Sequence, residues 1–173
     1  MKLNSLDDLL RDQLKDLYSA ENQLVKALPK LAKKATSESL AEAFTEHLEE
    51  TELQVERLNS IAKLLGVTIS GKKCKAMEGL IEEGQEVIDE DADPDVKDAA
   101  LIAAAQRVEH YEIAGYGSAR TFAQLLGLSD AAALLDQTLQ EEKHADKKLT
   151  SLAEGMINER ALGTEAASGV FTA

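Results

Sequence analysis

Apolar residues recur at every third or fourth position along most of the chain, which is the spacing of amphipathic α-helices. Residues 4–35 carry an almost unbroken apolar seam with a single acidic member. The seam consists of Leu10, Leu14, Leu17, Glu21, Leu24, Leu28, Leu31 and Ala35. Ser5 is the expected N-cap of this helix, and Pro29 is expected to bend it locally. A second helix is predicted over residues 37–65, because Gly66 is typical of the position that follows a helix.

The second half of the chain repeats this arrangement after a less regular segment. Residues 67–93 hold a glycine-containing loop and a shorter apolar repeat, so we expect a crossover with a small helix. The pair Asp93-Pro94 then supplies an N-cap followed by proline at the first helical position. It opens a third long helix over residues 94–126, and a fourth is predicted over residues 129–155.

The lengths of the connections determine the predicted topology. Short links make the first and second helices, and the third and fourth, antiparallel neighbours, whereas the long crossover joins the two pairs. We therefore predict an all-α protein, a ferritin-like four-helix bundle over residues 1–155 with a long crossover that contains a short fifth helix. Residues 156–173 are small and polar with little periodicity, and we expect a flexible C-terminal tail there.

The charge balance excludes several classes of partner. The 173 residues include 19 Lys and Arg against 32 Asp and Glu, which gives a formal net charge of −13. Nucleic acids and anionic membranes are bound by clusters of basic residues, so neither is an expected partner. The chain lacks an apolar run of the roughly 18 residues that span a bilayer, and its start lacks a signal-peptide core. We predict a cytoplasmic protein.

Acidic residues at core-facing positions are the main candidates for chemistry. Helical phase places Glu21 and Glu112 on inward faces, where an unpaired carboxylate is costly and a bound cation would offset that cost. Glu50 follows Glu21 by 29 residues, and Glu141 follows Glu112 by the same number. Each predicted helix pair would therefore bring one glutamate from each of its helices to a common level.

Further candidate ligands lie three residues from these glutamates, on the same helix faces. The complete predicted set is Glu21, His47, Glu50, Glu109, Glu112, Glu141 and His144. About four to six carboxylates and one or two imidazoles from four helices are typical of a site for two iron or manganese ions. The leucine phase of the last helix also directs Glu142 inward, so Glu142 is an alternative to Glu141.

Five segments of the chain read DLYSAENQL, EHLEETELQVERL, AMEGLIEE, DAALIAAAQRVEHYEIAGYG and TLQEEKHADKKL. These segments resemble the YciF-like bacterial stress-response family of the ferritin-like superfamily, and the resemblance covers most of residues 5–155. The resemblance implies a homodimeric helical protein of undefined biochemical activity, with a dinuclear metal motif in its bundle. Residues 109–112 are similar to the third-helix ExxE of rubrerythrins, and residues 141–144 are similar to their fourth-helix ExxH.

The second helix departs from the pattern of ferritin-like proteins, which usually carry ExxH there. Glu50 is followed three residues later by Leu53, where the pattern requires histidine. Either His47 replaces the missing histidine from the other side, or one metal has ligands that are all oxygen. This departure puts ferroxidase chemistry in question: it could favour manganese, weaken one site or leave the protein metal-free.

Two functions of different classes follow from these observations. The first is a dinuclear iron or manganese protein of bacterial stress response that oxidises iron or consumes oxygen or peroxide; whether it is an enzyme stays open. The second is a metal-free helical interaction or scaffold protein, in which Thr51 and Gln54 contribute to a buried hydrogen-bond network. A storage cage is a weaker third hypothesis, because the resemblance indicates dimers. The metal content of the purified protein separates the first two.

Overall fold

The helices predicted from the apolar repeat form within a few residues of their expected ends. The computed structural model describes residues 3–166, and those residues contain no β-strand. The helices are α1 (Leu6–Lys34), α2 (Glu38–Leu65), α3 (Lys75–Asp89), α4 (Pro94–Leu125), α5 (Ser129–Leu152) and α6 (Asn158–Ala166), with a π-helical turn over Ala153–Ile157. Among the described residues, we find no helix with the length and apolar character needed to cross a membrane.

Local side-chain chemistry sets these boundaries. The Ser5 side chain accepts a hydrogen bond from the Asp8 amide at 3.1 Å and caps α1. Asp93 caps α4 in the same way, with Pro94 at the first helical position. At the end of α2, Gly66 adopts a left-handed conformation with φ of 62°, which glycine reaches without steric cost. At these three helix ends the sequence signals are therefore reliable.

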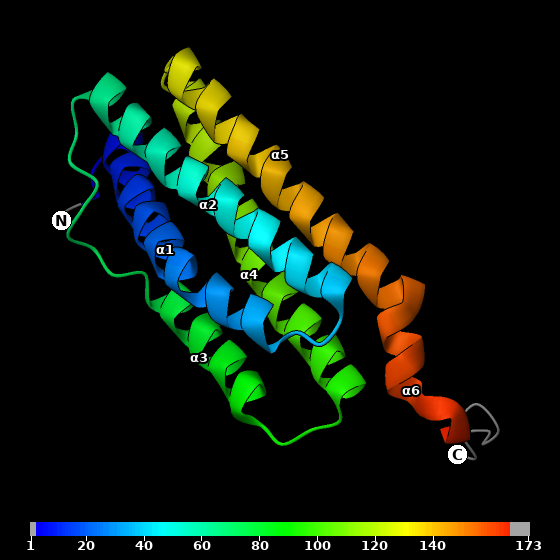
Figure 1. The fold of residues 1–173 in the computed structure, drawn as a ribbon. Helices are drawn as coiled ribbons and strands as arrows, with labels where there is room; N and C mark the ends of the chain where they lie inside the picture. The colour runs from blue at the N-terminus through cyan, green and yellow to red at the C-terminus, as the bar shows by residue number, and fades with distance from the viewer. Residues whose placement is uncertain (1–2, 167–173) are drawn as a thin grey trace, which may run out of the picture.

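The long helices form two antiparallel pairs that pack into one bundle (Figure 1). The hairpin of α1 and α2 lies against the hairpin of α4 and α5, with α1 beside α4 and α2 beside α5. The crossover contains α3, which packs against α1 and α4 on the outside of the bundle. This arrangement confirms the predicted all-α, ferritin-like four-helix bundle with a short fifth helix in its crossover.

A buried aspartate joins the two hairpins at the α1–α2 turn. Asp98, on α4, accepts hydrogen bonds from the backbone amides of Thr36 at 2.8 Å and Ser37 at 2.7 Å. The Ser37 side chain makes no capping bond of its own. Asp98 therefore supplies from another helix the acceptor that the start of α2 requires.

The end of the bundle differs from the prediction. The helical path does not stop near Gly155 but continues through the π-helical turn into α6, which packs against α4. Ala153 and Ile157 are both buried in the apolar cluster around Leu28 and Leu149, and this contact extends the helix. Within the tail predicted over residues 156–173, the described residues 156–166 are therefore in helical structure, and residues 167–173 lie outside the described residues.

The core is divided into two apolar clusters. One surrounds Leu14, Leu58 and Leu135, and the other surrounds Leu24 and Leu101. Between them lies a layer of buried polar side chains, which we call the polar layer. It comprises Glu21, His47, Thr51, Gln54, Glu109, Glu112 and Glu142.

Candidate metal centre

The ionisable side chains of the polar layer come from all four long helices. Glu21 lies on α1, His47 on α2, Glu109 and Glu112 on α4, and Glu142 on α5. His47 and Glu109 are 6% and 2% exposed, and the other three are fully buried. Each occupies the inward phase of its helix, among the other buried residues of that helix. The same periodicity that builds the core therefore carries these charges into it.

Four of these residues approach one another closely enough to share an ion. His47, Glu109, Glu112 and Glu142 each offer one ligand atom, and the four atoms lie within 4.8 Å of one another. The Nε2 atom of His47 is 3.3 Å from Oε1 of Glu109 and 3.9 Å from Oε2 of Glu142. Metal–ligand bonds of about 2 Å place two ligands of one ion up to about 4 Å apart. A small inward movement of these side chains would therefore suffice to bind a cation.

The hydrogen bonding of the cluster is incomplete. Neither carboxylate oxygen of Glu112 or Glu142 has a hydrogen-bond partner among the described residues, and the same holds for Oε2 of Glu21 and Oε2 of Glu109. Buried polar atoms are nearly always paired, because an unpaired one loses its hydration without compensation. Carboxylate oxygens with one imidazole are the donor set that suits iron or manganese. The residues present therefore fit a bound metal.

Electrostatics indicates the same need for a counter-charge. Burial raises the pKa of Glu21 to about 8. Burial and the charges of neighbouring carboxylates raise the pKa of Glu112 and Glu142 well above the usual value. Burial disfavours a charge on His47, but Glu109 beside it raises the pKa of the imidazole well above its usual range. The cluster resists holding several negative charges at once, so it either keeps protons or binds cations.

Tyr116 supports Glu21 inside the core. The Tyr116 hydroxyl donates a hydrogen bond to Oε1 of Glu21, and the phenol is fully buried. The sequence gives only a weak signal for this contact. Tyr116 follows Glu112 by four residues, so it lies on the same inward face of α4 as Glu112. This bond holds one Glu21 oxygen and leaves the other without a partner among the described residues.

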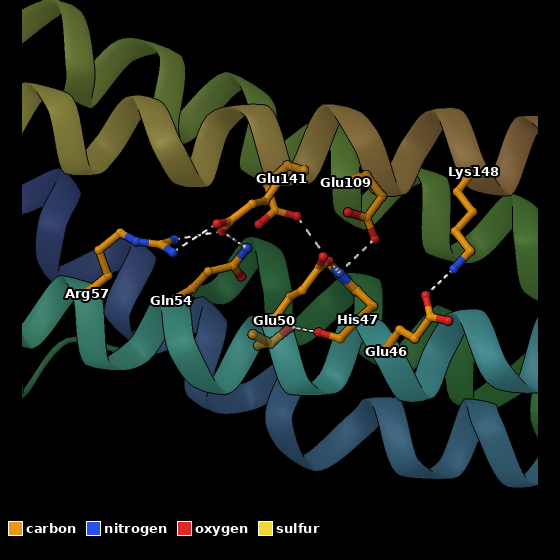
Figure 2. A network of polar contacts seen from close by, with 10 residues as sticks. Glu46, His47, Glu50, Gln54, Arg57, Glu109, Glu141 and Lys148 are labelled. Carbon is orange, nitrogen blue, oxygen red and sulfur yellow. Dashed lines mark hydrogen bonds and ion pairs between the residues drawn. The ribbon is translucent and has the colours of Figure 1, made fainter.

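The structure places Glu142, and not Glu141, in the cluster. The Glu141 carboxylate instead accepts hydrogen bonds from both terminal nitrogens of Arg57, at 2.7 and 2.9 Å, and from the Gln54 amide at 3.1 Å (Figure 2). Consecutive residues of a helix differ by about 100° in direction, so adjacent glutamates point to different sides. The prediction of Glu141 is corrected in favour of the alternative that the leucine phase had left open.

Glu50 and His144 lie at the edge of the cluster. The Oε2 atom of Glu50 is 3.6 Å from Nδ1 of His47, but 41% of the Glu50 side chain is exposed. His144 is exposed on α5. The contact with His47 lowers the pKa of Glu50, so this carboxylate is charged at neutral pH. The fully buried residue at this level of α2 is Thr51, whose hydroxyl donates to the His47 carbonyl oxygen at 2.7 Å.

The internal symmetry therefore survives with an interval one residue longer than predicted. Thr51 follows Glu21 by 30 residues, and Glu142 follows Glu112 by 30. In the second hairpin this pair consists of two carboxylates, whereas in the first a neutral hydroxyl replaces one of them. The two halves of the candidate centre are thus alike in position and unequal in charge.

Comparison with known proteins places the chain in a family. The family described as a domain of unknown function (DUF892) matches residues 5–162. Protein YciF of Escherichia coli (strain K12) is 50% identical over 162 residues, which cover 93% of this chain and 98% of YciF. The chain belongs to this YciF-like family.

Solved structures share the fold over most of the chain. The crystal structure of the E. coli stress protein YciF superposes with a TM-score of 0.88 and covers 91% of this chain and 99% of its own. YcfI from Rhodopseudomonas palustris, 47% identical, has a TM-score of 0.84 and covers 87% and 96%. A Xanthomonas campestris protein that is only 21% identical still reaches 0.73 over 91% of this chain and 99% of its own, which shows the fold alone.

Proposed function

We propose that the chain is a dinuclear metal–carboxylate protein that acts in bacterial stress response. The observation that carries this proposal is the buried cluster of one imidazole and four carboxylates, most of whose oxygens lack a hydrogen-bond partner among the described residues. The stress context comes from E. coli YciF, which is described as a stress protein. We expect the protein to act in the cytoplasm.

The charge of the polar layer supports two ions over one. Glu21, Glu109, Glu112 and Glu142 together carry four negative charges when ionised, and two divalent cations neutralise them. His47, Glu109, Glu112 and Glu142 would hold one ion. Glu21, whose charge together with burial raises the pKa of Glu112, would contribute to holding the second. Bound iron or manganese would supply redox chemistry toward oxygen or peroxide.

The surrounding residues have definable tasks in such a centre. Tyr116 orients Glu21 through its hydroxyl, and the apolar clusters on both sides exclude bulk water. Water exclusion strengthens the attraction between carboxylates and a cation, because the local dielectric constant is low. Arg57 forms an ion pair with Glu141 and holds this carboxylate outside the cluster, and the pair balances the positive charge of Arg57.

Metal analysis of matched variants tests the proposal. Protein stripped with EDTA and reloaded anaerobically with Fe²⁺ or Mn²⁺ should retain about two ions per chain, the number typical of carboxylate bundles. Glu142→Gln should lose metal, whereas Glu141→Gln, one residue away, should retain the wild-type amount. A wild-type protein without bound metal, or equal retention by both variants, would overturn the proposal.

A metal-free interaction or scaffold protein is the second candidate, and one observation favours it. The raised pKa values of Glu21, Glu112 and Glu142 allow these carboxyl groups to be neutral without a cation. Absence of tightly bound metal after reloading would favour this function. The homodimer that the resemblance implies stays a prediction, and sedimentation equilibrium at several protein concentrations tests it.

A further inference from the structure

A cavity between α2 and α5 leads from the surface to the polar layer. It has a volume of about 60 Å³, and its polar lining consists of Glu46, His47, Glu50, Glu109, His144 and Lys148. A buried water occupies roughly 10–15 Å³ on this measure, so the cavity has room for about four waters or for an ion that keeps part of its hydration shell. The cavity is therefore large enough to hold a small, partly hydrated cation.

The cavity lining changes from exposed to buried with depth. Glu50 and His144 form its outer part, where both side chains reach solvent. His47 and Glu109 form its inner part, and both are more than nine-tenths buried. Neither ring nitrogen of His47 has a hydrogen-bond partner among the described residues, and the same is true of Oε2 of Glu109. Figure 2 shows the Glu50 and Glu109 carboxylates on either side of the His47 ring.

We propose that this cavity is the access channel for divalent cations, and that Glu50 and His144 bind each cation transiently before it reaches His47 and Glu109. The inference rests on the proposed metal centre and concerns how that centre is filled. A carboxylate and an imidazole together attract and partly dehydrate such a cation. Their partial exposure keeps the outer site weak enough to release it inward.

An ion pair contributes to the lining of the channel. Lys148 of α5 is bound to Glu46 of α2, so the pair connects the two helices (Figure 2). Glu50 and His144 line the same cavity. The Lys148 ammonium opposes an approaching cation, whereas the Glu46 carboxylate offsets that charge. Lys148 therefore limits the rate of filling without touching the buried ligands.

Uptake kinetics distinguish the channel from the centre that it serves. Full-length EDTA-treated protein is mixed with Mn²⁺, quenched with EDTA after increasing times, desalted and analysed for retained metal. Glu50→Gln and His144→Ala should each fill about tenfold more slowly, which is the lower end of rate enhancement by charged clefts. Lys148→Gln should fill faster than wild type. All three should reach the wild-type metal content at long times.

Matched controls remove the same side-chain types outside the channel. Glu49→Gln changes the neighbouring exposed carboxylate of α2, and His110→Ala removes an exposed histidine of α4. Both should fill within about twofold of the wild-type rate, since exposed charges at a distance are screened by salt. The opposite effects of Glu50→Gln and Lys148→Gln are not expected from a general loss of packing.

Three outcomes would overturn the channel. Wild-type filling rates in Glu50→Gln and His144→Ala, with full metal content, would mean that cations enter elsewhere. A lower final metal content in Glu50→Gln would make Glu50 a resident ligand and not a transient one. Wild-type protein that retains no Mn²⁺ or Fe²⁺ would overturn the metal centre itself, and the channel with it.

Discussion

Protonation of Glu21 should couple the stability of the metal-free protein to pH. Burial raises the pKa of this carboxyl to about 8 from an ordinary value of 4.5. Between these values the folded state keeps a proton that the unfolded state has lost, so stability falls as the pH rises from about 4.5 toward 8. We expect urea unfolding of EDTA-treated protein to show this decline.

Two variants isolate the contribution of Glu21 to that decline. Glu21→Gln removes the titrating group and should flatten part of the fall, while the exposed Glu49→Gln should leave it as in wild type. The same slope in Glu21→Gln as in wild type would contradict the assignment of the titration to Glu21.

The positions of single residues were predictable only where the apolar seam identifies the inward phase. Glu21 and Glu112 each interrupt a seam, and both are buried as expected. The assumption that both hairpins use an interval of 29 residues was a less reliable guide to side-chain direction, because a shift of one residue rotates a side chain by about 100°. The buried positions are 30 residues apart, so Glu142 and not Glu141 points inward. The partner that holds Glu141 outside, Arg57, lies 84 positions earlier and could not be identified from local pattern.

At the scale of elements, α1 and α4 approach closely at Gly115. A Cβ atom on this residue would lie 2.8 Å from Cδ2 of Leu17, whereas a Cβ on Gly117 would meet no atom within 4 Å. Leu17 is buried, so it has little room to move aside. Gly117→Ala should stabilise the protein by up to about 1 kcal/mol through helix propensity.

Gly115→Ala should be less stable than Gly117→Ala by about 1–3 kcal/mol, the typical cost of overpacking. Urea unfolding midpoints of the two variants measure this difference directly. Equal stabilisation by both substitutions would show that Leu17 repacks freely and that the α1–α4 contact does not need glycine.

Asp98 gives a second prediction at this scale, since it caps α2 from α4. Asp98→Ala removes both acceptors and should lower the free energy of unfolding by about 0.5–2 kcal/mol, as loss of an N-cap does. Asp98→Asn retains one acceptor, so its free energy of unfolding should lie between those of the wild type and Asp98→Ala. Asp91→Ala, in the exposed loop before α4, is the control and should change stability little. Equal stabilities of Asp98→Ala and Asp91→Ala would contradict the capping role.

Element boundaries were predictable where a cap residue carries the information. Ser5, Gly66 and Asp93 end or start their helices as their chemistry requires. The continuation past Gly155 was not predictable, because the π-helical turn there changes the side-chain repeat and so hides the phase of Ile157. Tertiary burial of Ile157, and not local propensity, decides that segment.

At the scale of the whole molecule, the fold follows from two similar hairpins. Glu21 and Thr51 in the first correspond to Glu112 and Glu142 in the second, with 91 residues between equivalent positions. The polar layer crosses the bundle where these hairpins meet and separates the two apolar clusters. The bundle is therefore held together at both sides of a layer that is itself unfavourable without a counter-charge.

This division predicts where the metal-free protein opens first. Amide hydrogen exchange should be fastest, relative to metal-loaded protein, in residues 44–54 of α2, in residues 108–116 of α4 and in the turns of α1 and α5 that carry Glu21 and Glu142, because these segments flank the polar layer. Segments inside the apolar clusters should exchange at similar rates in both states, because their contacts do not depend on an ion. Mass spectrometry of EDTA-treated and Mn²⁺-loaded protein measures the difference. Binding should also raise the free energy of unfolding of the whole protein, by about 2.7 kcal/mol when the free Mn²⁺ concentration is 100 times the dissociation constant.

The Glu142→Gln variant is the control for the exchange experiment, and its exchange should respond little to Mn²⁺. Uniform protection along the chain after loading would contradict a local weakness at the polar layer, since a cation bound there stabilises the elements that supply its ligands before it stabilises the rest.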